Sequence, residues 1–152
     1  VEIDEAKKTS GGYFSMLRFN GGEYRSQIQL EVSLRTAEKA TGTAALVASD
    51  FIPAFTLMHL DEKTVVKEKA NALLTRAKAR DFYDLYFILR NRMAFGSVFA
   101  GDKTIKPRLL KQVKNTKSDL KNELKRFLPA GQLMILKDFK SILTAEIERS
   151  LP

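Results

Sequence analysis

The clearest pattern in this chain is an alternation of polar and apolar side chains over residues 27–35. A period of two places the apolar side chains on one side of a strand and the polar ones on the other. Residues 13–19 also fit a strand, and Asn20-Gly21-Gly22 between the two segments is a hairpin turn signal. We therefore expect an antiparallel hairpin over residues 13–35 with one buried face, formed in its second strand by Ile28, Leu30, Val32 and Leu34.

The pattern changes from strands to helices at Asp61. Before this residue, 36–50 has no firm period, so we expect an irregular segment or one short helix there. A short strand is expected over 55–60. Asp61 is a favourable N-cap for a helix over about 63–77, because its carboxylate can accept hydrogen bonds from the first helical amides.

The remainder of the chain predicts three further helices. Asp81 could cap the first of them, along which apolar residues repeat at helical spacing. The three helices are expected over about 81–93, 105–128 and 132–150, with a loop over 96–101. The whole pattern predicts an α+β fold, with a small antiparallel sheet in residues 1–62 and a C-terminal helical bundle in residues 63–152.

The positive charge of the chain is concentrated in the helical part. Residues 1–62 contain 6 Lys and Arg against 9 Asp and Glu, whereas residues 63–152 contain 20 against 9. The basic C-terminal part is therefore expected to face phosphate groups, either of a nucleotide or of a nucleic acid. Many basic surfaces only keep a protein soluble, so charge alone leaves both interpretations open.

The composition excludes several classes of site. Without cysteine there is no disulfide framework or thiolate metal site, and a single histidine gives no basis for an imidazole zinc site. No apolar run approaches the roughly 20 residues that cross a bilayer, and the first residues are not a secretory signal. We expect a cytoplasmic protein. Because the chain starts with Val1, we also expect it to begin inside a longer gene product, although Met removal would look the same.

Residues 67–89 combine apolar side chains with closely spaced charges. Lys69 and Arg76 are two helical turns apart and share one face of a helix. Such a face suits a polyanion, because Arg can bind phosphate through two hydrogen bonds and Lys through a point contact. The spacing E-K-x-x-A-L-x-x-R-x-K-x-R-D-x-Y-D-L over residues 68–85 resembles the last motif of the AbiEii/AbiGii toxin family of nucleotidyltransferases.

The resemblance implies roles for particular residues. It implies that nucleoside triphosphate is bound by Lys69, Arg76, Lys78 and Arg80. It also implies that Asp81 and Asp84 complete or brace the active site, with Glu31, Lys69 and Asp84 as the catalytic set. Glu31 matches the acidic residue of a central strand that holds Mg²⁺ in the family, which more often has Asp there.

A purely structural interpretation of the same residues stays open. Glu31 would then be an exposed strand residue paired with Arg35 or Arg18. Arg80 and Asp81 would cap the helix junction, and Asp84 would hold Arg76 in a partly buried pair. Separately, lysines recur at helical spacing further along the chain, beside an apolar row that ends at Phe127, and could contact a nucleic acid backbone. These lysines are Lys111, Lys114, Lys117, Lys121 and Lys125.

The sequence lacks one element of the resembled family. The family opens its catalytic domain with Gly-Ser and an acidic pair that holds the metal ions, whereas here Glu2-Ile3-Asp4 has the acidic spacing without Gly-Ser. We therefore expect an inactive C-terminal part of a nucleotidyltransferase. The resemblance implies a toxin–antitoxin or phage-defence system with an antitoxin encoded nearby. The joined enzyme would transfer a nucleotidyl group to an acceptor, which in some relatives is tRNA.

Two other functions are compatible with the residues. The chain could be a non-catalytic relative whose helical scaffold binds nucleic acid or a partner protein, or an unrelated α+β interaction module. An exposed apolar patch on the sheet of residues 13–35 would favour the nucleotidyltransferase interpretation, whereas a charged, closed edge would favour the others. An unpaired sheet edge could also pair with a second copy and give a homodimer.

Overall fold

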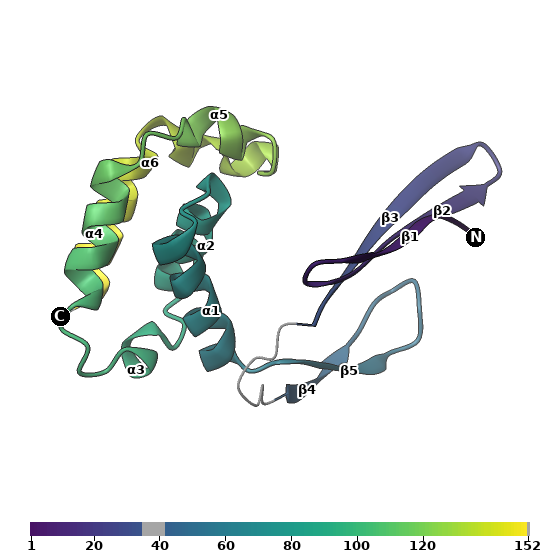
Figure 1. Cartoon of the computed structure of the whole chain (residues 1–152), viewed down its shortest axis with the longest axis horizontal. Coiled ribbons are helices and arrows are strands. Elements are labelled where there is room, and N and C mark those ends of the chain that lie inside the picture. The colour runs from purple at the N-terminus through teal and green to yellow at the C-terminus, as the bar shows by residue number, and fades with distance from the viewer. Residues whose placement is uncertain (35–41, 152) are drawn as a thin grey trace. The chain divides into compact units, whose positions relative to one another are not determined.

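The structure is a computed structural model that describes residues 1–34 and 42–151 (Figure 1). The chain divides into two compact units, Val1–Ala40 and Thr41–Pro152. The first contains one sheet, and the second contains a two-stranded sheet followed by helices. The α+β class expected from the sequence is confirmed, with two small sheets in place of one. The expectation for residues 36–41 lies outside the described residues.

The first unit is a three-stranded antiparallel sheet in the order β1-β2-β3. Strands β2 (Gly12–Gly21) and β3 (Tyr24–Ser33) form the expected hairpin, with Gly22 in the turn at a positive φ of 62°. Strand β1 (Glu2–Thr9) pairs with β2 and was not expected, because its mostly charged residues do not alternate with apolar ones. Its register shifts between Ile3 and Glu5.

The prediction that this hairpin has one buried face is wrong. The four residues assigned to it are between 44% and 61% exposed: Ile28, Leu30, Val32 and Leu34. A sheet buries a face only against a second layer, and residues 1–34 of this unit contain no other element to supply one. The alternation therefore predicted the strand and its sidedness correctly, but not its burial.

One glycine is required by the close approach of β2 and β3. A Cβ at Gly12 would lie 1.8 Å from the carbonyl oxygen of Val32, whereas nothing lies within 4 Å of the same position at Gly11. Gly12→Ala is therefore expected to destabilise the sheet by about 1–3 kcal/mol, the usual range for overpacking. Hydrogen exchange of the β2 and β3 amides should accelerate in Gly12→Ala and stay unchanged in Gly11→Ala. Equal exchange rates in the two variants would contradict the close approach.

The second unit begins with a hairpin of β4 (Gly42–Val47) and β5 (Phe55–Leu60). The strand expected over 55–60 is confirmed. For residues 42–47, the expected irregular segment or short helix is wrong. These small residues have no amphipathic period of their own, and their extended form is defined by pairing with β5.

The first two helices lie close to their expected positions. Helix α1 (Glu62–Thr75) is capped by Asp61, whose side chain accepts a hydrogen bond from the Thr64 amide at 2.9 Å. Helix α2 (Ala79–Arg90) packs against α1. Asp81 does not occupy the cap position expected for it, because the helix already starts at Ala79 and Asp81 lies within its first turn.

The later helices are shorter and more numerous than expected. The loop over 96–101 contains most of a short helix, α3 (Phe95–Val98). The prediction of a single helix over 105–128 is wrong, because α4 (Ile105–Asn115) ends before a second helix, α5 (Leu120–Lys125). Asp119 caps α5 by accepting a hydrogen bond from the Asn122 amide. The last helix is divided at Asp138 into a 3₁₀ helix, η1 (Ala130–Lys137), and α6 (Phe139–Ser150).

The hydrophobic core lies among the helices. Helix α1 packs on α2 and α4, and α6 packs on α2 and α4. The side chains without exposed surface include Val66, Leu73, Phe82, Leu109, Leu143 and Ile147. None of the helices in the described part of the chain is long and apolar enough to span a membrane.

Candidate nucleotide-binding site

The charged residues singled out from the sequence meet where α1 packs against α2. The ammonium of Lys69, on α1, donates a hydrogen bond to the carboxylate of Asp84, on α2, at 2.8 Å. The two side chains are 44% and 29% exposed, so solvent and a ligand can reach the pair. A cation held by a carboxylate at the surface of a packed helix pair has a defined direction, unlike a lysine that projects into water.

A second ion pair closes the junction between the two helices. Arg76 follows the end of α1, and its guanidinium donates from Nε and Nη2 to the carboxylate of Asp81, at 2.9 and 2.6 Å. The Lys78 amide donates to the same carboxylate at 3.0 Å. The Asp81 side chain is 0% exposed, whereas that of Arg76 is 41% exposed. Asp81 therefore fixes both the direction of Arg76 and the start of α2.

Burial is the largest influence on the Asp81 carboxyl, and by itself it raises the pKa. The hydrogen bonds from Arg76 and from the Lys78 amide, together with the charges of Arg76 and Arg80, outweigh burial and hold the pKa of Asp81 below its ordinary value. The hydrogen bond to Asp81 raises the pKa of Arg76 in turn. Both groups are therefore charged at neutral pH.

The pairing differs from the structural alternative considered for these residues. Asp84 was expected to hold Arg76, but its ion pair is with Lys69, and Arg76 is held by Asp81. The reason is the turn at residues 76–78: α1 has already ended when Arg76 is reached, so Arg76 lies beside the first turn of α2, one turn before Asp84. Lys78 and Arg80 are exposed on either side of this junction.

Glu31 lies in the other unit, on the polar face of β3. Its side chain is exposed and accepts a hydrogen bond from Gln29, and its neighbour across the strands is Phe14. The alternative in which Glu31 pairs with Arg18 is wrong, because Arg18 binds Asp4. The other candidate partner, Arg35, lies outside the described residues.

The residues present do not complete a divalent-cation site. Among residues 1–34 and 42–151, no three Asp, Glu, His or Cys side chains gather closely enough to hold a metal ion. Glu31 would supply a single carboxylate, whereas protein-bound Mg²⁺ is held by carboxylates together with water and substrate phosphates. The described residues therefore do not fit a divalent cation without further ligands.

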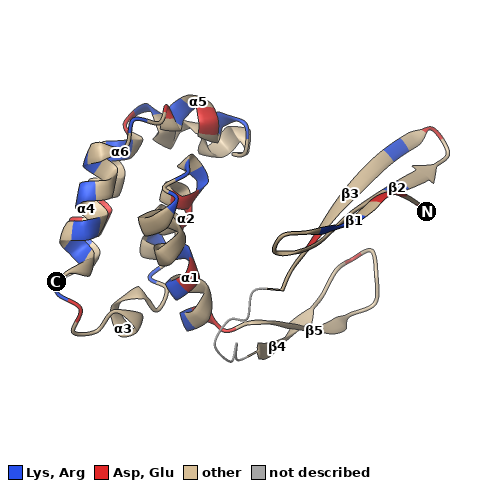
Figure 2. Ribbon diagram, viewed as in Figure 1, with Lys and Arg blue, Asp and Glu red and all other residues tan. Residues whose placement is uncertain are grey.

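The lysines expected to form one stripe are distributed over two helices. Lys111 and Lys114 are exposed on α4, Lys117 follows it, and Lys121 and Lys125 are exposed on α5. Figure 2 shows the basic positions on α4 and α5. Phe127, which was expected in the apolar row beside them, is 68% exposed. The break between the helices means that these lysines do not share one continuous helical face.

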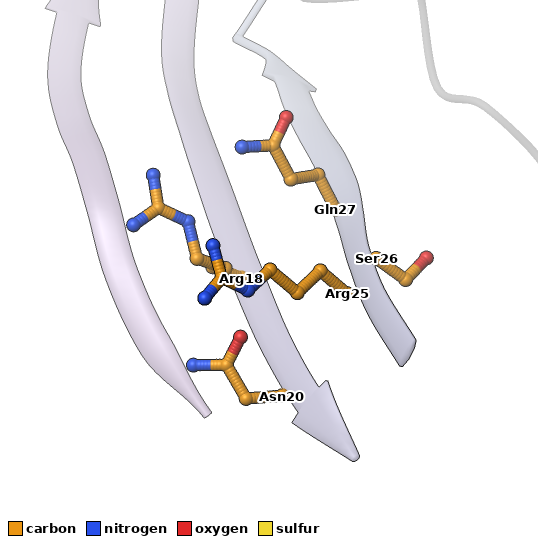
Figure 3. A pocket seen from close by; sticks show the side chains of 5 residues that line it. All are labelled: Arg18, Asn20, Arg25, Ser26 and Gln27. Carbon is orange, nitrogen blue, oxygen red and sulfur yellow. The ribbon is translucent and has the colours of Figure 1, made fainter. Parts of the chain in front are cut away.

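A second polar group, not predicted from the sequence, lies at the tip of the β2–β3 hairpin (Figure 3). Two arginines and two carboxamides line a hollow there. The signal was present in the sequence, because polar residues at alternate positions flank the turn on both strands. The residues are Arg18, Asn20, Arg25 and Gln27.

The comparison with protein families decides what this chain is related to. The model of the family described as "Nucleotidyl transferase AbiEii toxin, Type IV TA system" matches residues 1–145. The chain belongs to this family. Comparison with curated proteins and with solved structures gives no match.

Membership of the AbiEii family confirms the resemblance found in residues 68–85. It supports a nucleotidyltransferase-like toxin of a type IV toxin–antitoxin system, which implies an antitoxin as partner. Nucleotidyltransferases of this kind generally use a divalent metal. The matched residues include both units, so the sheet and the helices belong to one family architecture.

Proposed function

We propose that the surface formed by α1 and α2 binds the phosphates of a nucleoside triphosphate and that Lys69 is the residue in direct contact. The observation that carries the proposal is the Lys69–Asp84 pair, a half-exposed ion pair within the matched family region. The ammonium has three donors, and one of them is used by Asp84. The others remain for phosphate oxygens, and Asp84 acts through Lys69 as a positioning residue.

Arg76 has a different part in this proposal. Two of its donor groups are bound to Asp81, so the guanidinium is fixed and keeps only its outer edge for a phosphate. Lys78 and Arg80 are exposed and add positive charge at the start of α2, just before Asp81 in the chain. Three cations around one helix junction create a positive potential that attracts a triphosphate, and pairing with Asp81 keeps Arg76 from folding away.

The proposed reaction is nucleotidyl transfer to an acceptor hydroxyl, with tRNA as one candidate acceptor. The hydroxyl oxygen forms a bond to the α-phosphorus as its proton passes to water, the bond from this phosphorus to the bridging oxygen breaks, and pyrophosphate leaves with the electron pair. Fixed cations near the phosphates stabilise the charge that develops on the leaving group. This is the chemical contribution that we assign to Lys69 and Arg76.

The transfer reaction requires a metal-holding element in addition to these residues. Residues 1–152 contain no Gly-Ser followed by an acidic pair, so we propose that a segment outside them supplies it. Glu31 would add one carboxylate and Mg²⁺ would be the metal. In this proposal the chain binds nucleotide by itself and supports transfer only when joined to that element, as part of a system that acts in phage defence.

Nucleotide binding by the chain itself tests the proposal. Lys69→Ala is expected to weaken binding of each NTP about 10- to 100-fold in calorimetric titration, the effect of losing one charge-assisted contact. The matched control is Lys67→Ala, which removes the same charge from the same helix two positions away, on a different face. Equal affinities in the two variants, or no NTP binding by the unaltered chain, would contradict the proposal.

A second candidate function is non-catalytic binding of nucleic acid or of an acidic partner by the helices. The observation in its favour is α4, which has four basic residues and no acidic one: Lys106, Arg108, Lys111 and Lys114. The ammonium of Lys106 is engaged within the chain, because it donates a hydrogen bond to the carbonyl oxygen of Leu151 at 2.6 Å. A chain that binds nucleic acid through Lys111 and Lys114 and does not bind NTP would support this function.

A further inference from the structure

The tip of the β2–β3 hairpin has an open, polar hollow of about 710 Å³ that the proposed nucleotide site does not use. Figure 3 shows that four of the side chains lining it lean to the same side of the sheet, whereas Ser26 points away. The four are Arg18, Asn20, Arg25 and Gln27. This hollow lies in the first unit, and Lys69 lies in the second.

The register of the two strands explains why these side chains gather. Arg18 is the cross-strand partner of Gln27, and Asn20 is the partner of Arg25. Residues two apart on a strand point to the same face, so both pairs lie on one side of the sheet. Each arginine is thus opposite a carboxamide and diagonal to the other arginine, which is a distance that long side chains can span.

The two arginines differ in how their charge is compensated. Arg18 binds the carboxylate of Asp4 at 2.5 Å, and Gln27 donates to the same carboxylate at 3.3 Å. Arg25 has no ion pair or side-chain hydrogen bond to any residue in the described ranges. One guanidinium in the hollow therefore has no carboxylate partner among the described residues, and Figure 3 shows it beside the guanidinium of Arg18.

We propose that this hollow binds a phosphodiester group of a nucleic acid strand, with Arg25 as the main contact and Asn20 beside it. A guanidinium suits a phosphate because its donors match two oxygens at once. The carboxamides of Asn20 and Gln27 both donate and accept, as contacts to sugars and base edges require. Asp4 binds Arg18, and Glu2 lies opposite Arg18 in the register. The negative charges of these two carboxylates disfavour a phosphate at Arg18 and leave Arg25 as its contact.

A polymer fits this surface better than a free nucleotide. A single arginine with one amide gives few contacts to an isolated phosphate. The polar face continues along β3 through Gln29, Glu31 and Ser33, whereas β2 has Met16 and Phe14 on this face. Strand β3 is 10 residues and roughly 33 Å long, so a nucleic acid strand can make further polar contacts along it. Many weak phosphate contacts along a chain are the usual source of nucleic acid affinity.

Binding of labelled oligonucleotides to the whole chain, without NTP, tests this inference. The probes are a 20-nucleotide single-stranded RNA, an RNA hairpin and single-stranded DNA, each measured by fluorescence anisotropy over a range of salt concentrations. Arg25→Ala is expected to lower affinity about fivefold or more and to reduce the slope of log K against log salt by roughly 0.7–0.9, the loss of one phosphate contact. Asp4→Asn is expected to raise affinity, because it removes a carboxylate and releases Arg18.

The matched control is Lys8→Ala, which also removes one positive charge from the sheet. Lys8 pairs with Tyr13 across the strands and so lies on the opposite face from Arg25. Equal affinities of Arg25→Ala and Lys8→Ala would overturn the inference, as would the absence of binding to all three probes. A loss confined to Lys111→Ala and Lys114→Ala would also overturn it and assign binding to α4.

The hollow and the proposed nucleotide site can be tested separately. Lys69→Ala is expected to retain oligonucleotide binding while its affinity for NTP falls about 10- to 100-fold, because the two sites lie in different units. If Arg25→Ala weakens binding, equal affinity for RNA and DNA would indicate contact with the phosphate backbone. A preference for one probe would indicate which polymer the hollow binds. Circular dichroism of Arg25→Ala should match that of the unaltered chain, since the Arg25 side chain is exposed.

Discussion

Arg76→Ala is expected to destabilise the helical unit by about 3–5 kcal/mol, because it leaves the Asp81 carboxylate buried without its charge partner. The carboxylate is 0% exposed and would keep only the Lys78 amide as a hydrogen-bond donor. Asp81→Asn should cost less, about 1–2 kcal/mol, because the amide oxygen still accepts from Lys78 and the half-exposed Arg76 can turn to water. Urea unfolding followed by circular dichroism at 222 nm measures both.

The control for this prediction is Arg80→Ala, which removes an exposed arginine four residues further along the same junction. Its effect should stay within about 0.5 kcal/mol, as for most exposed positions. The double variant Arg76→Ala with Asp81→Asn should be more stable than Arg76→Ala alone, since no buried charge is left. Similar losses in Arg76→Ala and Arg80→Ala would mean that the Asp81 pair does not stabilise the fold.

The pH dependence of this pair follows from the lowered pKa of Asp81. The folded pKa lies below the ordinary value of 3.8, so the pair stabilises the fold fully above about pH 4 and loses this effect as pH falls through the folded pKa. In Arg76→Ala, burial is opposed only by the Lys78 amide and the charge of Arg80, and the pKa of Asp81 should rise. The difference in unfolding free energy between the two proteins should therefore shrink between about pH 7 and about pH 3.5. A constant difference would contradict the assignment.

Lys69→Ala is expected to lower nucleotidyl transfer about 100- to 1,000-fold in the protein that also carries the metal-holding element. The physical reason is that a fixed cation stabilises the charge that develops on the departing pyrophosphate. Lys69→Arg should retain part of the activity, since the charge is kept but the geometry changes. Radiolabel transfer from NTP to an acceptor RNA measures the effect.

Asp84→Asn provides the comparison that separates positioning from folding. Loss of the carboxylate should lower kcat about 10-fold with a smaller change in KM, because the Lys69 ammonium is then less well oriented when the leaving-group charge develops. A merely structural pair would instead change the unfolding free energy and leave kcat per folded molecule unchanged. Lys67→Ala should retain full activity, and an equal loss in Lys67→Ala and Lys69→Ala would refute the role of Lys69.

The alternation and spacing in the sequence were sufficient to predict several parts of the fold. The hairpin of β2 and β3, the cap at Asp61 and the family motif were all predicted correctly, because each depends on residues close in the chain. Strands β1 and β4 were missed because they have no amphipathic period, and only pairing with β2 and β5 gives them an extended form.

The helices end and begin at local caps, which cannot be recognised from an apolar pattern that continues across them. Residues 105–128 keep helical spacing across Lys117, yet the chain ends one helix at Asn115 and starts another after Asp119. As a consequence, the candidate lysines lie on two helices. A pattern of side chains cannot show where a cap will replace a continuing helix, because both choices bury the same apolar residues.

The sequence by itself determined most of the strand and helix types, the family and the set of charged residues near positions 69–84. Only the tertiary structure decided which charges meet, because this depends on where α1 ends and how α2 packs against it. In the structure Asp84 forms an ion pair with Lys69, and the buried Asp81 forms an ion pair with Arg76. The tertiary structure also decided that the apolar face of β3 is exposed and that Arg18 and Arg25 share one hollow. Burial and pairing are properties of the whole unit, whereas period and capping are properties of neighbouring residues.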